Sequence, residues 1–285
     1  MKKKLLTIAV MTALTVSTAS VYAAAPTFSG DANIEYRNQD GGGDYLTNRI
    51  RLNVDSQIDD TFYIHGRMRM DNDLRNGNAD NKTSFDQAYL GAKVGQVDVR
   101  AGKQSLAIGK GLLMDDDKFT GAHLATVVEG VKLNGFTGKD PANVNTSYGD
   151  VSTTWGNVNV GATYLYEGDH YYAVNADTKL TDNVVLNVEY AKNSTTEKNG
   201  YLAEVVVGNA VKKGDMKYSL SYRDIDASAI PDFTTDGWYK DSKGFRIKGA
   251  YKVSDAATLT AYQDLGEAQN GDDHKRTNVE FAVTF

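Results

Sequence analysis

Residues 46–71 of the 285-residue chain read LTNRIRLNVDSQIDDTFYIHGRMRMD. In the first half of this stretch, apolar residues occupy every second position: Ile50, Leu52 and Val54. Such alternation predicts a β-strand with one apolar and one polar face. The pattern resumes after a three-residue turn, and Ile58 and Phe62 flank that turn in matching phase. We therefore expect an antiparallel hairpin whose two faces differ in polarity.

The same alternation continues to the last residue and divides the chain into sixteen expected strands of about ten residues each. They are residues 27–37, 45–58, 62–71, 84–94, 97–105, 122–133, 143–148, 150–155, 157–167, 170–180, 184–193, 200–211, 216–225, 242–253, 257–264 and 276–285. The hairpin at 143–155 has the weakest pattern. Without it the count would be fourteen, which is also even, as expected when both termini lie at one rim of a barrel.

Short and long connections alternate along much of the chain. Tight turns such as 59–61 and 95–96 alternate with longer polar segments such as 72–82 and 226–241. In an up-and-down barrel this arrangement puts the tight turns at one rim and the long loops at the other, as in transmembrane barrels. The sequence therefore predicts an all-β protein, a transmembrane antiparallel up-and-down β-barrel of about sixteen strands.

Aromatic and proline positions fit a membrane barrel better than a soluble β-sandwich. The two prolines in the body of the mature chain, Pro141 and Pro231, fall in expected loops, as strand ladders require. A sandwich would have one shared core, whereas here one face carries Arg or Lys on strand after strand. Aromatic residues lie near strand ends on the apolar face, as membrane girdles do: Phe28, Tyr36, Tyr166, Tyr190, Tyr222, Phe245 and Phe285.

Composition excludes several other classes of protein. The chain has no cysteine, so disulfides, thiol catalysis and thiolate metal sites are excluded. Its net charge of −6 argues against a nucleic-acid-binding surface. After residue 23 no apolar run is long enough for a transmembrane helix. The four histidines show no metal-binding spacing, and we expect no metal, no cofactor and no catalytic residues.

Residues 1–23 have the three-part pattern of a secretory signal peptide. Three lysines precede an apolar segment at residues 5–16, and Ala23 ends a small-residue cleavage motif. We therefore expect residues 24–285 to form the exported barrel domain.

A barrel of fourteen or sixteen strands should enclose water, because side chains fill the interior only up to about eight strands. Five arginines concentrate on the polar face in the first part of the chain: Arg49, Arg51, Arg67, Arg69 and Arg100. The turn at 59–61 puts Arg51 opposite Arg69. Like charges that face each other are unfavourable unless an anionic group or solute lies over them. The alternative is that these arginines only solvate a wide lumen.

The one long connection in the first half after these arginines is 106–121, LAIGKGLLMDDDKFTG, which contains Asp115, Asp116 and Asp117. If this loop folds into the lumen, its acids would face the arginines across a constriction. Small ions would then cross a transverse electric field. The alternative is that the acidic run lies in solvent at a loop tip, as charge runs usually do.

Residues 85–113, FDQAYLGAKVGQVDVRAGKQSLAIGKGLL, resemble Gram-negative porins from the fourth strand into the constriction loop. The resemblance rests on Asp86 followed by Ala-Tyr-Leu-Gly, and on Arg100 followed by Gly-Lys-Gln, in which the lysine is Lys103. The terminal Phe285 resembles the assembly signal of outer-membrane barrels. The mature chain as a whole is similar to the porin barrels of diderm Firmicutes. Those porins often carry a surface-layer-homology domain, a pattern from which this chain departs.

The resemblance implies a location in the outer membrane of a diderm bacterium, in contact with outer-membrane lipid. It implies that the barrel-assembly machinery recognises the C-terminal strand and that the protein is a homotrimer. It also implies that the loop after the fifth strand folds inward, so that Lys103 lines the constriction together with the arginines and the acidic run.

We therefore expect a porin that forms a water-filled channel for passive diffusion of small hydrophilic solutes and ions, with a mild anion preference. A substrate-specific channel is the first alternative. A barrel hydrolase is the second, because His65 and Asp55 should face each other across the hairpin. His65 shares the phase of the lumen arginines, whereas the nucleophile of outer-membrane lipases faces the lipid side, so we expect no enzymatic turnover.

Overall fold

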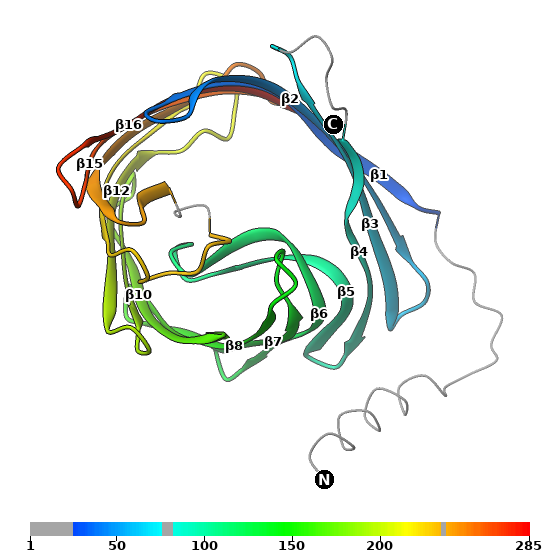
Figure 1. The fold of residues 1–285 in the computed structure, drawn as a ribbon. Coiled ribbons are helices and arrows are strands. Elements are labelled where there is room, and N and C mark those ends of the chain that lie inside the picture. The colour runs from blue at the N-terminus through cyan, green and yellow to red at the C-terminus, as the bar shows by residue number, and fades with distance from the viewer. Residues whose placement is uncertain (1–24, 76–81, 235–237) are drawn as a thin grey trace.

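Over residues 25–75, 82–234 and 238–285, which the structure describes, the chain folds into one closed antiparallel barrel of sixteen strands (Figure 1). This structure is a computed structural model. Strands that are neighbours in the sequence are neighbours in the sheet, and β1 pairs with β16. The all-β up-and-down barrel and the strand count are thereby confirmed. The expected signal segment 1–23 lies outside the described residues.

The strand bounds follow the expected ones closely in most of the chain. The strands are β1 Thr27–Gln39, β2 Gly43–Gln57, β3 Phe62–Asp73, β4 Lys82–Val94, β5 Val97–Ile108, β6 Met114–Val128, β7 Val131–Lys139, β8 Asn145–Trp155, β9 Val158–Glu167, β10 Asp169–Thr181, β11 Val184–Asn193, β12 Lys198–Gly208, β13 Met216–Ile225, β14 Ser242–Lys252, β15 Ala257–Ala268 and β16 Asp273–Thr284.

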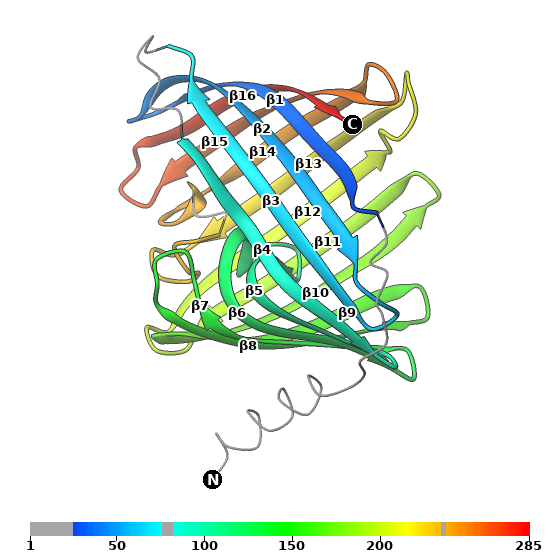
Figure 2. The same cartoon turned by 90° about the vertical axis from the view of Figure 1, so that its right-hand side faces the viewer.

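The first and last strands close the barrel side by side (Figure 2). Residues 31–39 pair with residues 276–284 in antiparallel register. Gly30 and Phe285 exchange two further backbone hydrogen bonds of 2.8 and 3.0 Å. A Cβ on Gly30 would lie 2.5 Å from the Phe285 ring, so the terminal phenyl group can lie there only against a glycine. The closed ladder satisfies the backbone of both terminal strands.

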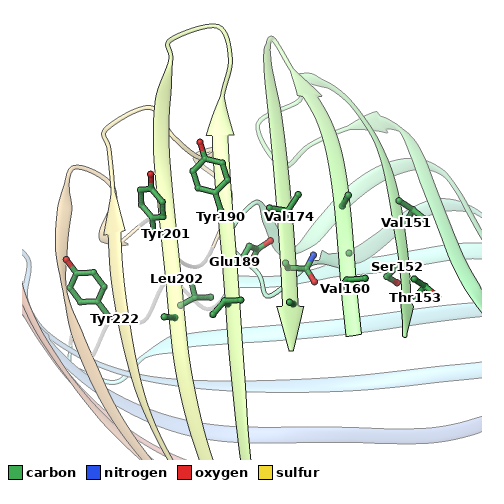
Figure 3. Close-up of a pocket in the computed structure, with 16 residues that line it drawn as sticks. Val151, Ser152, Thr153, Val160, Val174, Glu189, Tyr190, Tyr201, Leu202 and Tyr222 are labelled. Carbon is green, nitrogen blue, oxygen red and sulfur yellow. The ribbon is translucent and has the colours of Figure 1, made fainter. Parts of the chain in front are cut away.

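The outward face of the sheet is apolar over most of its area. Leu220 and Ile247, for example, are 49% and 55% exposed although nothing in their side chains can bind water. Figure 3 shows Tyr190, Tyr201 and Tyr222 in one row near the ends of β11, β12 and β13. Together with neighbouring valines and alanines, these tyrosines line an apolar hollow of about 740 Å³. An apolar surface of this kind would be unfavourable in contact with water, whereas lipid accommodates it.

The strand count agrees with the expectation only because two errors in the expectation cancel. The pattern predicts one strand at 122–133, but β6 ends at Val128 and β7 begins at Val131. Between them Glu129 and Gly130 have positive φ angles of 51° and 82°. Two successive residues with positive φ are typical of a two-residue hairpin turn. The expected strand 122–133 is therefore wrong.

The expected hairpin at 143–155 is also wrong, because these residues form the single strand β8. Gly149, the expected turn residue, pairs with Gly135 on β7 and Tyr164 on β9 within an unbroken register. A glycine in a strand weakens the alternation pattern without ending the strand.

The hairpin β5–β6 curls into the barrel (Figure 1), as the resemblance implies for the loop after the fifth strand. The non-strand part is only 109–113, because β5 continues to Ile108 and β6 begins at Met114. The ladder shifts register between Gln104 and Leu106. A β-bulge of this kind bends a strand pair. The infolded element is therefore a bent hairpin rather than the loop 106–121 that the sequence predicts.

The connection 226–241 is expected as a long polar loop at one rim, but its described residues fold into the barrel (Figure 1). Its described residues Ala229, Ile230 and Tyr239 are at most 1% exposed. Removing these apolar and aromatic side chains from water lowers the free energy of the folded chain, and a loop in solvent could not bury them. The prediction of a solvated outer loop is wrong here.

Among the described residues, no helix has the length and apolarity needed to cross a membrane.

Adjacent residues of β11 test the assignment of the two faces. Val188 faces outward near the middle of the strand, and Asn187 faces inward, where its amide donates to Glu204 at 3.1 Å. We expect Val188→Arg to lower the free energy of unfolding by about 2–4 kcal/mol, because it puts a charge into lipid. Asn187→Arg keeps the new charge on the inner face beside the Glu204 carboxylate, so it should change the free energy of unfolding by less than about 1 kcal/mol. Denaturant titration of the barrel in lipid vesicles measures both, and equal losses would contradict the assignment.

Candidate functional site in the barrel lumen

The inner face of β2 and β3 carries a row of arginines, defined here as Arg49, Arg51, Arg67 and Arg69. Arg51 lies opposite Arg69 in the hairpin ladder, and Arg67 lies opposite Asn53. The turn between the strands therefore produces the register that the sequence predicts.

Carboxylates on neighbouring positions compensate part of this arginine row. Nε of Arg51 lies 2.9 Å from both carboxylate oxygens of Asp31 on β1. Nε of Arg69 donates to Asp71 at 2.6 Å. By contrast, Nε of Arg49 is buried and has no hydrogen-bond partner within the part of the chain that the structure describes. The protein itself therefore offsets much of the repulsion that the sequence alone left unexplained.

Asp86 reaches the arginine row because of a β-bulge in β4. Arg67 pairs with Gln87 and Met68 pairs with Phe85, which leaves Asp86 as the extra residue. Phe85 is 66% exposed on the outside, whereas Asp86 and Gln87 are both buried. Two successive side chains thus point inward, and Asp86 accepts two bonds of 2.9 and 2.8 Å from Arg67. Strict alternation cannot predict this ion pair.

Arg100 and Lys103, the other two basic residues predicted for the constriction, bind groups that the arginine row does not use. Arg100 lies near the start of β5, where it donates to Asp98 at 2.8 Å and to the Tyr63 hydroxyl at 3.2 Å. The ammonium group of Lys103 donates to the backbone carbonyl of Phe85 at 3.0 Å.

The tip of the β5–β6 hairpin is bound to the wall across the lumen. The backbone amides of Lys110 and Leu112 donate to one oxygen of Glu189 on β11, at 2.9 and 3.0 Å. The Lys110 side chain forms an ion pair with Asp177 on β10. These bonds hold the tip of the infolded hairpin against β10 and β11.

The acidic run lies on the returning strand of this hairpin. The backbone of Asp115 pairs with Ala107, and that of Asp116 pairs with Leu106. Asp115 is half-buried, and the side chains of Asp116 and Asp117 lie outside what the structure describes. The backbone of the run is therefore on the infolded element, which is the position that the resemblance implies.

A second basic cluster lies on the inner face of β14–β16, and we name it the Asp264 cluster. Asp264 is fully buried and accepts bonds of 2.6 Å from Arg246 and 2.9 Å from Arg276. It also accepts a bond of 2.8 Å from the Tyr239 hydroxyl. Strand alternation gives no signal that Asp264 would accept hydrogen bonds from these three donors.

His65 lacks the surroundings of a catalytic histidine. Its Nδ1 lies 2.7 Å from Asp55, as the sequence predicts, and its ring stacks on Tyr89. Its Nε2 lies 3.1 Å from the Gln87 amide. An amide therefore occupies the place that a nucleophilic hydroxyl would need. Across the described residues, no group of three or more His, Asp or Glu side chains could hold a metal ion.

A closed barrel with an apolar outside, a charged inside and an infolded hairpin defines a channel-forming membrane protein. A model of the Gram-negative porin family matches residues 9–285 of the chain. The chain therefore belongs to the Gram-negative porin family. It is an outer-membrane porin that forms a channel, and its family and fold point to a channel rather than an enzyme.

Solved structures show the same fold at low sequence identity. Two mutants of the Rhodopseudomonas blastica porin have TM-scores of 0.68 and 0.67 with 13% and 14% identity. A structure described as showing asymmetric conductivity of engineered proteins has a TM-score of 0.67 with 13% identity. Each comparison covers 92% of this chain and 100% of the other. No curated protein matches the chain at the level that the comparison requires.

The buried pair of Arg67 and Asp86 gives a stability prediction. We expect Asp86→Asn to destabilise the barrel by about 3–5 kcal/mol, because it leaves a buried guanidinium without its carboxylate. The matched control is Asp71→Asn, since Asp71 pairs with Arg69 but its side chain is 38% exposed. That loss should not exceed about 1 kcal/mol. Unfolding in denaturant measures both, and equal effects would show that burial of the Arg67 pair carries no special weight.

Proposed function

We propose that this porin allows passive diffusion of small hydrophilic solutes and ions, with a mild preference for anions. The observation that carries the preference is the arginine row, whose Arg51 and Arg69 side chains remain 25% and 20% exposed on the lumen wall. The Asp264 cluster adds two guanidinium groups around a single carboxylate. Fixed cations along a narrow aqueous path raise the local concentration of anions.

The lumen constriction supports a size limit on the solutes. The tip of the β5–β6 hairpin is fixed to Glu189 and Asp177. Displacing it would break two hydrogen bonds from backbone amides to the Glu189 carboxylate and the ion pair with Asp177. Side chains rather than a dedicated binding pocket then set the width of the path. A substrate-specific channel would differ in showing saturable current block by one solute.

We also propose the processing and assembly that the resemblance implies. Residues 1–23 would direct export, and residues 24–285 would form the mature barrel. The barrel-assembly machinery would recognise β16 and the terminal Phe285, a residue that is 67% exposed. The mature protein would assemble as a homotrimer in contact with outer-membrane lipid.

Reversal potential in a planar bilayer under a salt gradient tests the anion preference. We expect single channels of the purified protein to conduct, with a reversal potential on the anion-selective side at low salt that shrinks at high salt because of screening. A cation-selective reversal potential would reject the preference, and the absence of channels would reject the proposed diffusion function.

The double variant Arg51→Ser with Arg69→Ser tests which residues produce the preference. It removes two positive charges and frees the carboxylates of Asp31 and Asp71, so we expect the reversal potential to shift toward cations. The control is Lys243→Ser. Lys243 is exposed, and it lies three positions before the inward-facing Arg246 on β14 and therefore on the opposite face of the strand. An unchanged reversal potential in the double variant would show that the arginine row does not set selectivity.

A further inference from the structure

The connection between β13 and β14 is attached to both the barrel wall and the hairpin tip. Its described residues are 226–234 and 238–241, and we call them the β13–β14 insertion. Ala229 and Ile230 belong to the same buried apolar cluster as Leu112 and Leu113 of the hairpin tip. The insertion and the tip therefore share one core inside the lumen.

Tyr239 attaches the insertion to the barrel wall. Its side chain is fully buried, and its hydroxyl donates to Asp264 at 2.8 Å. The guanidinium groups of Arg223 and Arg246 lie 5.2 and 5.6 Å from the centre of its ring, within the range of cation–π attraction. Burial raises the pKa of the Tyr239 hydroxyl, so it stays protonated and keeps its hydrogen bond to the carboxylate.

Trp238 strengthens this attachment from the neighbouring position. The guanidinium group of Arg276 lies 4.6 Å from its ring centre, and the His274 ring stacks on it at 4.2 Å. Nε2 of His274 also lies 2.5 Å from the Trp238 backbone oxygen. Two successive aromatic residues of the insertion are thus held by cationic residues of β13–β16.

Thr234 and Phe233 attach the insertion to the hairpin. The Thr234 hydroxyl donates to the Gly111 carbonyl at the tip, at 2.9 Å. The Phe233 ring meets Phe119 edge to face at 5.0 Å between centres. Such edge-to-face pairs add about 0.5–1.5 kcal/mol beyond the burial of their area.

The shared core covers one side of the lumen only. Its wall residues lie on the inner face of β7–β13: Phe136, Tyr148, Leu165, Tyr171, Ala173, Ala191, Leu202 and Ile225. The arginines of β1–β3 lie outside this core, and Arg37, Arg51 and Arg69 remain 36%, 25% and 20% exposed. The core therefore leaves uncovered the part of the wall that carries the arginine row.

We infer that the β13–β14 insertion is a second constriction element and that Tyr239 is its positioning residue. Tyr239 holds the insertion against β13–β15, and the insertion in turn holds the hairpin tip over β7–β12. Together they fill that side of the lumen and confine solutes to the arginine-bearing wall. This inference rests on the proposed diffusion function and adds the residues that set its width.

The test is single-channel recording of Tyr239→Ala, Tyr239→Phe and Thr234→Val in planar bilayers. Tyr239→Ala removes both the hydrogen bond and the ring, so we expect higher conductance, a larger size limit for neutral polymers and a reversal potential closer to zero. Tyr239→Phe keeps the ring between Arg223 and Arg246 and should lie between wild type and Tyr239→Ala. Thr234→Val removes only the bond from the insertion to the Gly111 carbonyl and leaves the bonds of the tip to Glu189 and Asp177, so it should raise current noise.

Tyr201→Ala is the matched control. Tyr201 is 50% exposed on the outer face (Figure 3), so its replacement should leave conductance unchanged. Folding of each variant is checked by the different migration of heated and unheated barrel in detergent gels. If Tyr239→Ala does not fold, Tyr239→Phe and Thr234→Val carry the test. Folded Tyr239 variants with wild-type conductance and selectivity, or a folded Thr234→Val variant with wild-type current noise, would overturn the inference. A wild-type barrel without conductance would instead overturn the proposed function, and the inference with it.

Discussion

The structure depends on one constraint, which is that no backbone amide or carbonyl can face lipid without a hydrogen-bond partner. Pairing of β1 with β16 satisfies it by leaving no strand edge, and the two bonds between Gly30 and Phe285 complete the seam. Closure of sixteen strands then creates an interior wide enough for water. The alternation of side chains follows, because each strand separates a lipid from an aqueous phase.

The same constraint leaves the inside of the barrel free to carry charge and chain. Arg67 and Asp86 can be buried as a bidentate pair because each satisfies the other. The lumen also accepts two inserted segments, and these cover each other's apolar side chains in one core against β7–β13. This core lies against β7–β13, whereas the arginine row lies on β2 and β3.

The alternation of apolar and polar residues was sufficient to predict the barrel. The strand bounds and side-chain contacts that could not be predicted lie where the chain departs from that alternation. The turn at Glu129 and Gly130 interrupts a run that keeps its phase, and Gly149 weakens a strand that continues. The hairpin register of Arg51 and Arg69 followed from the turn length alone. The inward position of Asp86 depends on a bulge, and the position of Tyr239 depends on its tertiary contact with Asp264, 25 residues away in the chain. Neither feature produces a periodic signal in the sequence.

The central claim is that water lies inside this barrel and lipid outside, and thiol labelling of β2 tests it most directly. The chain has no cysteine, so each introduced one is unique. In lipid vesicles, a membrane-impermeant thiol reagent should modify Arg51→Cys and Asn53→Cys rapidly, and Leu52→Cys and Val54→Cys slowly. Fast reaction at 52 and 54, or equal rates at all four positions, would contradict the account.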